Sequence, residues 1–247
     1  MRLAILTDLH ANREALGACL AHAERQKAEQ YAFLGDLVGY GADPEWVIDT
    51  VIDYVGRGAH VLVGNHDIDL VGPDRQGMHQ VARSVVDWTR SRLSETQLAF
   101  VRALPYRIEL PDLLLVHANA WAPEKWEYVD GPMDATRSLY ACSAHVTFCG
   151  HVHMPALYNM TLAGKTGRFT PIPDAPIPLG KTRRWLAIPG SVGQPRDGNP
   201  AACYAIFDTV SEVLTYFRVP YDTVTAAQKV LDAGLPIGLA ERLLTGF

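Results

Sequence analysis

Five short motifs rich in aspartate, asparagine and histidine are spread over the first 153 residues of the chain. They read Asp8-Leu9-His10, Gly35-Asp36, Gly64-Asn65-His66-Asp67, His117 and Gly150-His151-Val152-His153. Carboxylate, amide and imidazole groups are ligands of Mn, Fe, Zn, Co and Ni ions, and these motifs contain no thiolate of the kind found in structural zinc sites. If the side chains meet in space, they can form a catalytic metal centre.

Taken singly, each motif is a weak signal. An Asn-His pair in a glycine-flanked turn is ordinary turn chemistry, and an isolated histidine such as His117 is more often a hydrogen-bonded polar residue than a ligand. The pair His151 and His153 is stronger, because side chains at i and i+2 of an extended segment share one face and can hold one or two ions. The five motifs together, in this order, favour a metal site.

Each motif directly follows a short apolar run that predicts a strand. These runs cover residues 3–7, 31–34, 60–63, 113–116 and 146–149. In open α/β sheets, the loops beyond the carboxyl ends of neighbouring strands line one crevice, so residues distant in sequence can meet there.

Amphipathic stretches between these runs predict crossover helices and therefore an α/β fold. Asn12 can cap a helix over residues 13–28, and Ser94 with Gln97 can cap a shorter one that reaches residue 103. Two further helices are expected from the turn at 39–44 to residue 54 and over 78–93. Additional strands are expected at 107–110, 185–188, 203–207 and 213–219, and the late ones predict a second sheet packed on the first.

The 247 residues, of which 48% are hydrophobic, suffice to bury one large core. We therefore predict a single domain over residues 1–247 whose tail, about 222–247, returns to helical spacing with Gly234 and Pro236 as a break. The Pro-rich loop at 170–178 is expected to be an excursion and not a domain boundary.

The net charge of −5 shows no basic excess, so no specific nucleic-acid binding is expected and any anionic substrate must be attracted locally. We expect no membrane association and a cytoplasmic location, because the sequence has no long apolar span and no signal segment. The four widely spaced cysteines are expected to be free thiols, mostly buried, as suits a reducing compartment. They are Cys19, Cys142, Cys149 and Cys203. The sequence leaves the oligomeric state open.

In this order, the five motifs resemble the signature of the calcineurin-like metallophosphoesterase superfamily: D-x-H, G-D, G-N-H-[DE], H and G-H-x-H. The segment 188–196 is similar to a later segment of small bacterial and archaeal members. The resemblance implies two packed mixed β-sheets flanked by helices, an αββα sandwich, and a two-metal phosphoesterase that acts on a small phosphoester substrate through a metal-bridging hydroxide.

Carried over position by position, the resemblance implies two metal-binding groups that share one residue. Asp8, His10 and His153 would bind one ion, Asn65, His117 and His151 the other, and Asp36 would bridge them. His66 would lie beside the ions without binding them, and we predict that it is the catalytic acid. The role of Asp67, in orienting a neighbour or in stabilising the turn, stays open.

Charge explains how an acidic protein would handle phosphate at this site. Two divalent ions bring four positive charges, against two negative ones from Asp8 and Asp36, so a bridging hydroxide still leaves a positive centre. Ions roughly 3.5 to 4 Å apart can both lower the pKa of a shared water and clamp the attacking and leaving groups.

One departure from the Ser/Thr protein phosphatase branch bears on the substrate. That branch carries G-D-x-V-D-R-G, whereas this chain has Gly39 and Tyr40 in place of the second Asp and the Arg. A doubly charged phosphomonoester benefits more from a bidentate guanidinium than a singly charged diester does. We therefore predict a phosphodiesterase acting on a nucleotide or another small phosphodiester. The alternatives are a dinucleoside polyphosphate hydrolase, a broad phosphomonoesterase, and a non-catalytic scaffold of the same fold.

Several other residues allow two interpretations, one functional and one structural. Tyr40, Trp121, Trp126 and Tyr128 could stack on a base or an aryl leaving group, or simply pack a loop onto the domain. Arg196 could contact a phosphate, although a surface turn is the better default. The four histidines that match no motif are expected to be structural or surface residues: His22, His60, His79 and His145. Gly190 and Gly193 are expected to serve backbone geometry.

Overall fold

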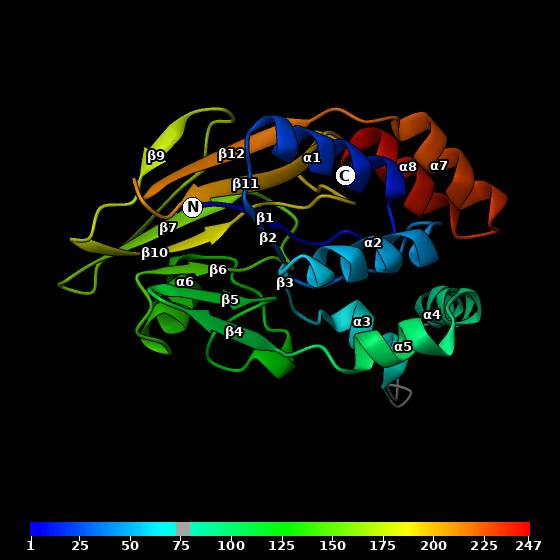
Figure 1. The fold of residues 1–247 in the computed structure, drawn as a ribbon, viewed down its shortest axis with the longest axis horizontal. Helices are drawn as coiled ribbons and strands as arrows, with labels where there is room; N and C mark the ends of the chain where they lie inside the picture. Colours follow the sequence, from blue (N-terminus) through cyan, green and yellow to red (C-terminus); the bar gives the residue numbers. More distant parts are fainter. Residues whose placement is uncertain (73–79) are drawn as a thin grey trace.

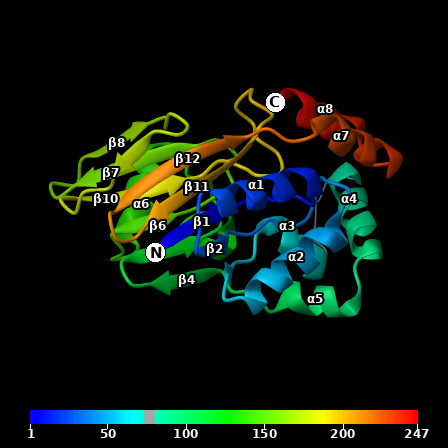
Figure 2. The ribbon, with the colours of Figure 1, turned by 45° about the horizontal axis from the view of Figure 1, so that its top comes forward.

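Two mixed sheets of six strands each, packed face to face, form the centre of the part of the chain that the structure describes, residues 1–72 and 80–247 (Figure 1). This structure is a computed structural model. Strands gather at one end of the molecule, and helices α2, α3, α4, α5, α7 and α8 gather at the other in both views (Figure 2).

The first sheet has the order β3-β2-β1-β11-β12-β9. Its strands are β1 (Arg2–Leu6), β2 (Gln30–Phe33), β3 (His60–Val61), β9 (Pro176–Pro178), β11 (Ala202–Asp208) and β12 (Val213–Val219). Strands β1, β2 and β3 are parallel, whereas β11 is antiparallel to β1 and pairs Phe207 with Leu3. The sheet is therefore mixed.

The second sheet has the order β4-β5-β6-β10-β7-β8. Its strands are β4 (Arg107–Leu110), β5 (Leu113–Val116), β6 (Val146–Phe148), β7 (Ala156–Thr161), β8 (Thr166–Phe169) and β10 (Arg183–Ile188). Strands β5, β6 and β10 are parallel, and β4 and β7 pair antiparallel with β5 and β10. This sheet is mixed as well.

Side chains that alternate along each strand explain why the two sheets pack on each other and are covered by helices. Leu3 and Ile5 of β1 face the core between the two sheets, whereas Ala4 and Leu6 face α1 (Arg13–Arg25) and α2 (Pro44–Gly56). In β5, the alternate residues face either the core between the sheets or α6 (Pro132–Tyr140). Each sheet thus buries both faces, and the predicted αββα sandwich is confirmed.

The remaining helices frame the end of the sandwich. They are α3 (Asn65–Val71), α4 (Gln80–Arg92), α5 (Glu95–Arg102), α7 (Thr223–Asp232), α8 (Ile237–Thr245) and the 3₁₀ turn η1 (Pro123–Lys125). The tail helices α7 and α8 pack against Val85 of α4 in a small apolar cluster of their own. None of the helices within residues 1–72 and 80–247 combines the length and apolar composition needed to cross a bilayer.

Most local predictions are confirmed. Asn12 caps α1 by accepting a hydrogen bond from the Ala15 N–H, and Ser94 and Gln97 form the predicted capping box of α5. The four cysteines are free, and all but the half-buried Cys142 are buried. Residues 78 and 79, including His79, lie outside the described residues.

The division of strands between the sheets differs from the prediction. The late strands do not form the second sheet by themselves, because β11 and β12 join β1 in the first sheet, whereas β10 pairs with β6 in the second. The loop at 170–178 contains the edge strand β9. Helices α3 and α6 and the hairpin β7–β8 were not predicted.

Candidate metal centre

All seven predicted ligands lie together, each just beyond the carboxyl end of a strand. They come from β1 and β2 (Asp8, His10, Asp36), from β3 (Asn65), from β5 (His117) and from β6 (His151, His153). The predicted meeting of these side chains beyond the strand ends is therefore observed, but it joins strands of both sheets. All seven are buried except Asn65, which is half-buried.

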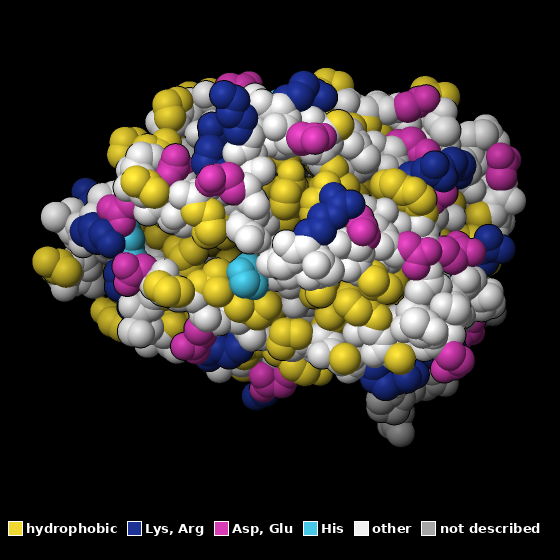
Figure 3. Space-filling view, viewed as in Figure 1, with side chains coloured by type: hydrophobic (Ala, Val, Ile, Leu, Met, Phe, Trp, Pro, Cys, Tyr) yellow, Lys and Arg dark blue, Asp and Glu magenta, His cyan; other side chains and the backbone are white. Residues whose placement is uncertain are grey.

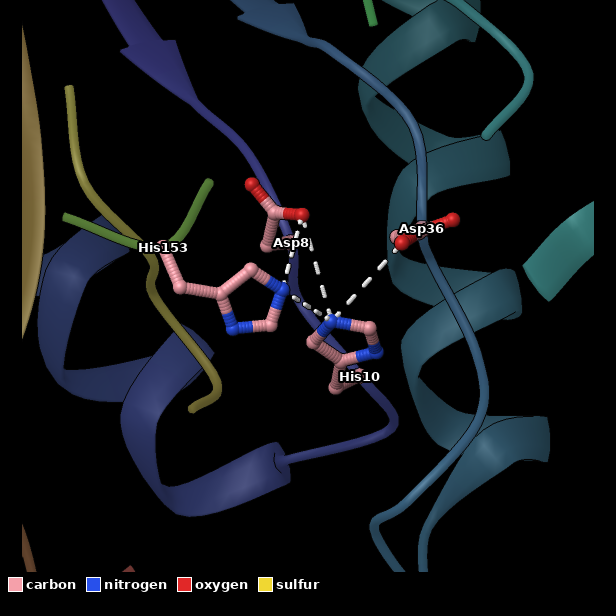
Figure 4. A group of neighbouring side chains, drawn as sticks. All are labelled: Asp8, His10, Asp36 and His153. Atoms are coloured by element: carbon pink, nitrogen blue, oxygen red, sulfur yellow. Dashed lines mark hydrogen bonds and ion pairs between the residues drawn. The ribbon is translucent and has the colours of Figure 1, made fainter. Parts of the chain in front are cut away.

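The first group consists of Asp8, His10, Asp36 and His153, whose potential ligand atoms all lie within 4.8 Å of one another (Figure 4). The Nε2 atom of His153 lies 3.1 Å from Asp8 Oδ1 and 3.0 Å from His10 Nε2. Asp36 Oδ2 lies 3.8 Å from His10 Nε2. Four side chains from three loops thus point at a common centre.

The second group is built around His117 and shares Asp36 with the first. His117 Nε2 lies 3.4 Å from Asp36 Oδ2, 3.3 Å from Asn65 Oδ1 and 3.3 Å from His151 Nδ1. The structure therefore separates the seven residues into the two groups that the resemblance implied, with Asp36 between them.

Backbone carbonyls hold the outer nitrogen of every histidine in the two groups. The pairs are His10 Nδ1 with Val38 O (3.2 Å), His117 Nδ1 with Leu34 O (2.7 Å), His153 Nδ1 with Gln194 O (2.6 Å) and His151 Nε2 with Trp126 O (3.0 Å). A carbonyl can only accept, so each outer nitrogen carries the hydrogen of the neutral ring. Each inner nitrogen then turns a lone pair toward the centre, as a metal ligand requires.

This arrangement is unfavourable without a cation. The inner nitrogens of His10 and His153 are 3.0 Å apart and face the carboxylate of Asp8. Lone pairs and carboxylate oxygens at such distances repel unless a positive charge lies among them. The donor set therefore fits a divalent metal ion.

The pKa values point the same way. Burial alone would lower the pKa of His117, but the charge of Asp36 outweighs it and raises the pKa to about 9. Burial lowers the pKa of His10, and burial together with His117 lowers that of His151 to about 4. The two carboxylates thus favour one positive charge at the centre, whereas burial and the neighbouring histidines oppose further protonation. A negatively charged centre of this kind suits a bound cation.

The backbone is strained at these residues. Asp8, His10, Asp36, His151 and His153 all have left-handed φ values between 48° and 67°. Non-glycine residues rarely adopt this conformation, and it persists where the surrounding structure enforces it, often at functional sites. The expectation that His151 and His153 share one face of an extended segment was wrong, because this conformation turns the two rings toward different groups.

Two glycines let the backbone close on the carboxylates. A Cβ atom on Gly64 would lie 2.1 Å from Asp36 Oδ1, and one on Gly150 would lie 2.6 Å from Asp8 Oδ2. Farther along, Gly193 approaches the Leu9 carbonyl so closely that a Cβ atom would lie 1.9 Å from it, and Gly190 has φ +102°. The predicted backbone roles of Gly190 and Gly193 are confirmed.

Asp67 has a structural position. Its Oδ1 accepts hydrogen bonds from the N–H groups of Leu37 (2.9 Å) and Val38 (3.2 Å), and its Oδ2 accepts one from Gly64 (2.8 Å). Burial and the charge of Asp36 raise its pKa to about 7. This carboxyl group ties the loop after β2 to the start of α3 and so positions Asp36 and Asn65.

Replacing Asp67 by alanine is expected to lower the free energy of unfolding by about 3 kcal/mol or more, because three buried N–H groups lose their acceptor. Urea unfolding of the two proteins measures the difference. Asp208→Ala is the matched control, since Asp208 also accepts two backbone N–H groups but at the surface. Equal losses of unfolding free energy in the two variants would contradict this role of Asp67.

His66 lies beside the first group without joining either. Its ring makes edge contacts with His10 (centroids 5.1 Å apart) and Tyr40 (4.4 Å), and among the described residues its ring nitrogens make no hydrogen bond. Burial lowers its pKa, although Asp36 opposes the effect. In either protonation state the ring carries at least one N–H group that can donate.

Arg196 is not the exposed turn residue that the sequence analysis favoured. It is half-buried, with its guanidinium 5.7 Å from the Tyr40 ring centre and Nη2 3.4 Å from the Tyr40 hydroxyl. Its Nε and Nη2 atoms also donate to Gln194 Oε1. A positive charge thus lies next to the position where the phosphatase motif would have its arginine.

The aromatic segment has mixed roles. Tyr128 stacks on His151 with ring centroids 4.1 Å apart, and Trp126 contacts His117 in addition to holding His151 through its carbonyl. Trp121 instead packs under Arg137, 4.4 Å from the guanidinium carbon. Trp126 and Tyr128 therefore support the site, and Trp121 supports the loop.

Sequence reasoning missed the groups that orient the histidines. Leu34, Val38, Trp126 and Gln194 act through their carbonyls, which every residue type has, so no sequence signal could identify them. The role of Thr7, which donates to Asp8 Oδ2 at 2.8 Å, could have been inferred from its place beside the first motif.

Comparisons with known proteins agree with this geometry. Residues 1–212 match the family described as the calcineurin-like phosphoesterase superfamily domain. The chain is 32% identical to an uncharacterised protein of Methanocaldococcus jannaschii, over 99% of this chain and 98% of that one. It is also 32% identical to a metallophosphoesterase from Sphaerobacter thermophilus of known structure, with a TM-score of 0.89 and coverage of 100% and 99%. A hypothetical protein from Pyrococcus horikoshii, 19% identical, shares the fold with a TM-score of 0.81 and coverage of 100% and 98%.

Proposed function

Because the chain belongs to the calcineurin-like phosphoesterase superfamily and is thus a metal-dependent phosphoester hydrolase, we propose that it is a two-metal phosphodiesterase for small or nucleotide phosphodiesters. The observation that carries the proposal is the pair of side-chain groups that share Asp36. One ion alone would not account for two such groups.

In this proposal, Asp8, His10 and His153 hold one ion, Asn65, His117 and His151 hold the other, and Asp36 contacts both. When bound, the ions supply the Lewis acidity that activates water and neutralises the phosphate charge. Mn, Fe, Zn, Co and Ni all suit these nitrogen and oxygen ligands. The outer carbonyls fix the orientation of the four imidazoles with one nitrogen of each ring toward the centre, so the site needs little rearrangement when the ions bind.

Arg196 supports a diester substrate. Its Nε and Nη2 atoms are engaged by Gln194, and among the described residues its Nη1 atom makes no hydrogen bond. A single amino group and the neighbouring positive charge suit a singly charged diester better than a monoester, which would gain from a bidentate contact through two nitrogens. The loop from Gly35 to Gly41 offers no second guanidinium.

Charge distribution supports a small substrate. On the face shown in Figure 3, Lys and Arg side chains alternate with Asp and Glu, without a continuous basic surface. Nucleic-acid binding relies on such a surface. We therefore keep the proposals of a small phosphoester substrate and of no specific nucleic-acid partner.

Hydrolysis of bis(p-nitrophenyl) phosphate tests the proposal. We expect turnover with added Mn²⁺, loss of turnover with a chelator, and a higher kcat/KM than for p-nitrophenyl phosphate. Asn65→Ala and His117→Ala each remove a proposed ligand and should lose most of the activity. Metal-independent turnover, or full activity in both variants, would contradict the proposal, and a complete lack of turnover would favour a non-catalytic scaffold.

A further inference from the structure

A cavity of about 420 Å³ opens beside His66. Its walls come from α3, from α4 and from α8, and it also reaches Gly39 and Tyr40 in the loop after β2. Its size falls in the range of small-molecule sites, about 300 to 1,000 Å³.

The walls that the structure describes are mainly apolar. Leu70, Val85, Val86 and Leu239 contribute aliphatic surface from three different helices. Thr89 also lines the cavity, but its hydroxyl already donates to the Val85 carbonyl at 2.8 Å. Asp69 and Arg242 also line the cavity, and the Nε atom of Arg242 already donates to the Phe247 carbonyl, but most of the exposed lining is apolar. Against these aliphatic walls a sugar or a base would leave polar atoms unpaired, whereas an alkyl or aryl group would not.

The cavity borders the proposed active site, because two of its lining residues contact a proposed metal ligand. His66 and Tyr40 line the cavity, and both of their rings contact His10 of the first metal-binding group. A phosphodiester held at the metal centre can therefore direct one of its ester groups past His66 into the cavity. That ester oxygen would lie next to the proposed proton donor, so this group is the one that leaves.

One wall lies outside the family domain. The family match ends at residue 212, whereas α8 (Ile237–Thr245) supplies Leu239 and Gly238 to the cavity. Metal ligands define the reaction, but the surrounding walls select the substrate. The tail helices, which the common domain lacks, are thus in a position to set substrate choice.

We propose that this cavity binds an apolar alkyl or aryl group on the leaving oxygen of the substrate. The inference rests on the proposed phosphodiesterase function. In the reaction, water adds to phosphorus, the bond from phosphorus to that ester oxygen breaks, and the apolar alcohol departs with a proton.

Phenyl methyl phosphate and 4-butylphenyl methyl phosphate test the cavity, because the two phenols leave with similar ease but differ in apolar size. Each buried methylene is worth about fourfold in affinity, so we expect kcat/KM to be at least about tenfold higher for the butyl compound. Ala82→Trp places a large ring at the exposed edge of the cavity and should reduce this preference at least about fivefold without changing metal content. Val210→Trp, on an exposed turn that does not line the cavity, should retain the preference for the butyl compound.

Binding of the same two diesters to chelator-treated protein, measured by calorimetry, tests the cavity independently of the hydrolysis reaction. Tighter binding of the butyl compound, lost in Ala82→Trp, supports the cavity even if neither diester is hydrolysed, and only the proposed function then fails. Metal-dependent hydrolysis with equal kcat/KM and equal affinity for both diesters overturns the cavity proposal and leaves the function intact. An unchanged preference in Ala82→Trp also overturns it.

Discussion

Asp36→Asn is expected to lower phosphodiester hydrolysis by about 10³-fold or more, because it removes the negative charge shared by both metal-binding groups. Asp36 Oδ2 lies 3.4 Å from His117 Nε2 and 3.8 Å from His10 Nε2. Asparagine has nearly the same shape, and its Oδ1 can still accept the hydrogen bond from the backbone N–H of His66. Steady-state kinetics with bis(p-nitrophenyl) phosphate and metal analysis by mass spectrometry measure the effect.

Asp53→Asn is the matched control, since it changes the same charge on an exposed carboxylate paired with Arg57. This variant should keep its metal and its activity. The shared position of Asp36 also predicts that Asp36→Asn loses both ions and not one. Full metal content in Asp36→Asn, or a loss of activity below about tenfold, would contradict the bridging role.

His66→Gln is expected to lower kcat by about 10² to 10⁴-fold, the usual contribution of a positioned acid or base, while the protein keeps its metal. The loss should depend on the leaving group. A p-nitrophenolate departs without help, whereas a phenolate needs a proton, so phenyl methyl phosphate should lose more activity than methyl p-nitrophenyl phosphate. Initial rates on the two substrates provide this comparison.

A purely structural His66 would give equal losses on both substrates, and a metal ligand at this position would show reduced metal content. His145→Gln is the control, because His145 lies away from the centre near Gly180 and Glu212. Its activity should match that of the unchanged protein on both substrates.

The order of the motifs made the site predictable from the sequence. Asp8, Asp36 and His117 each follow an apolar strand, and a parallel arrangement brings carboxyl ends to one edge. Local signals such as the Asn12 cap act within a few residues, so the start of α1 at Arg13 was predicted correctly, although the helix ends at Arg25 and not at residue 28. These features depend on short stretches of sequence.

The rest depends on contacts between distant segments. Nothing in the β11 sequence specifies that it pairs with β1, because edge strands of either sheet would accept an apolar run. The left-handed conformation of His151 and His153 reflects the loops packed around them and not their own preference. Arg196 reaches Tyr40 across 156 positions of the chain, and the cavity beside His66 exists only once α8 has packed near α4.

A crystal structure of the protein grown with Mn²⁺, with anomalous scattering recorded, would show whether two ions share Asp36. We expect two anomalous peaks roughly 3.5 to 4 Å apart. One should contact Asp8, His10 and His153, the other Asn65, His117 and His151, and Asp36 should lie between them. A single peak, or two peaks that do not share Asp36, would contradict a two-metal centre in this protein.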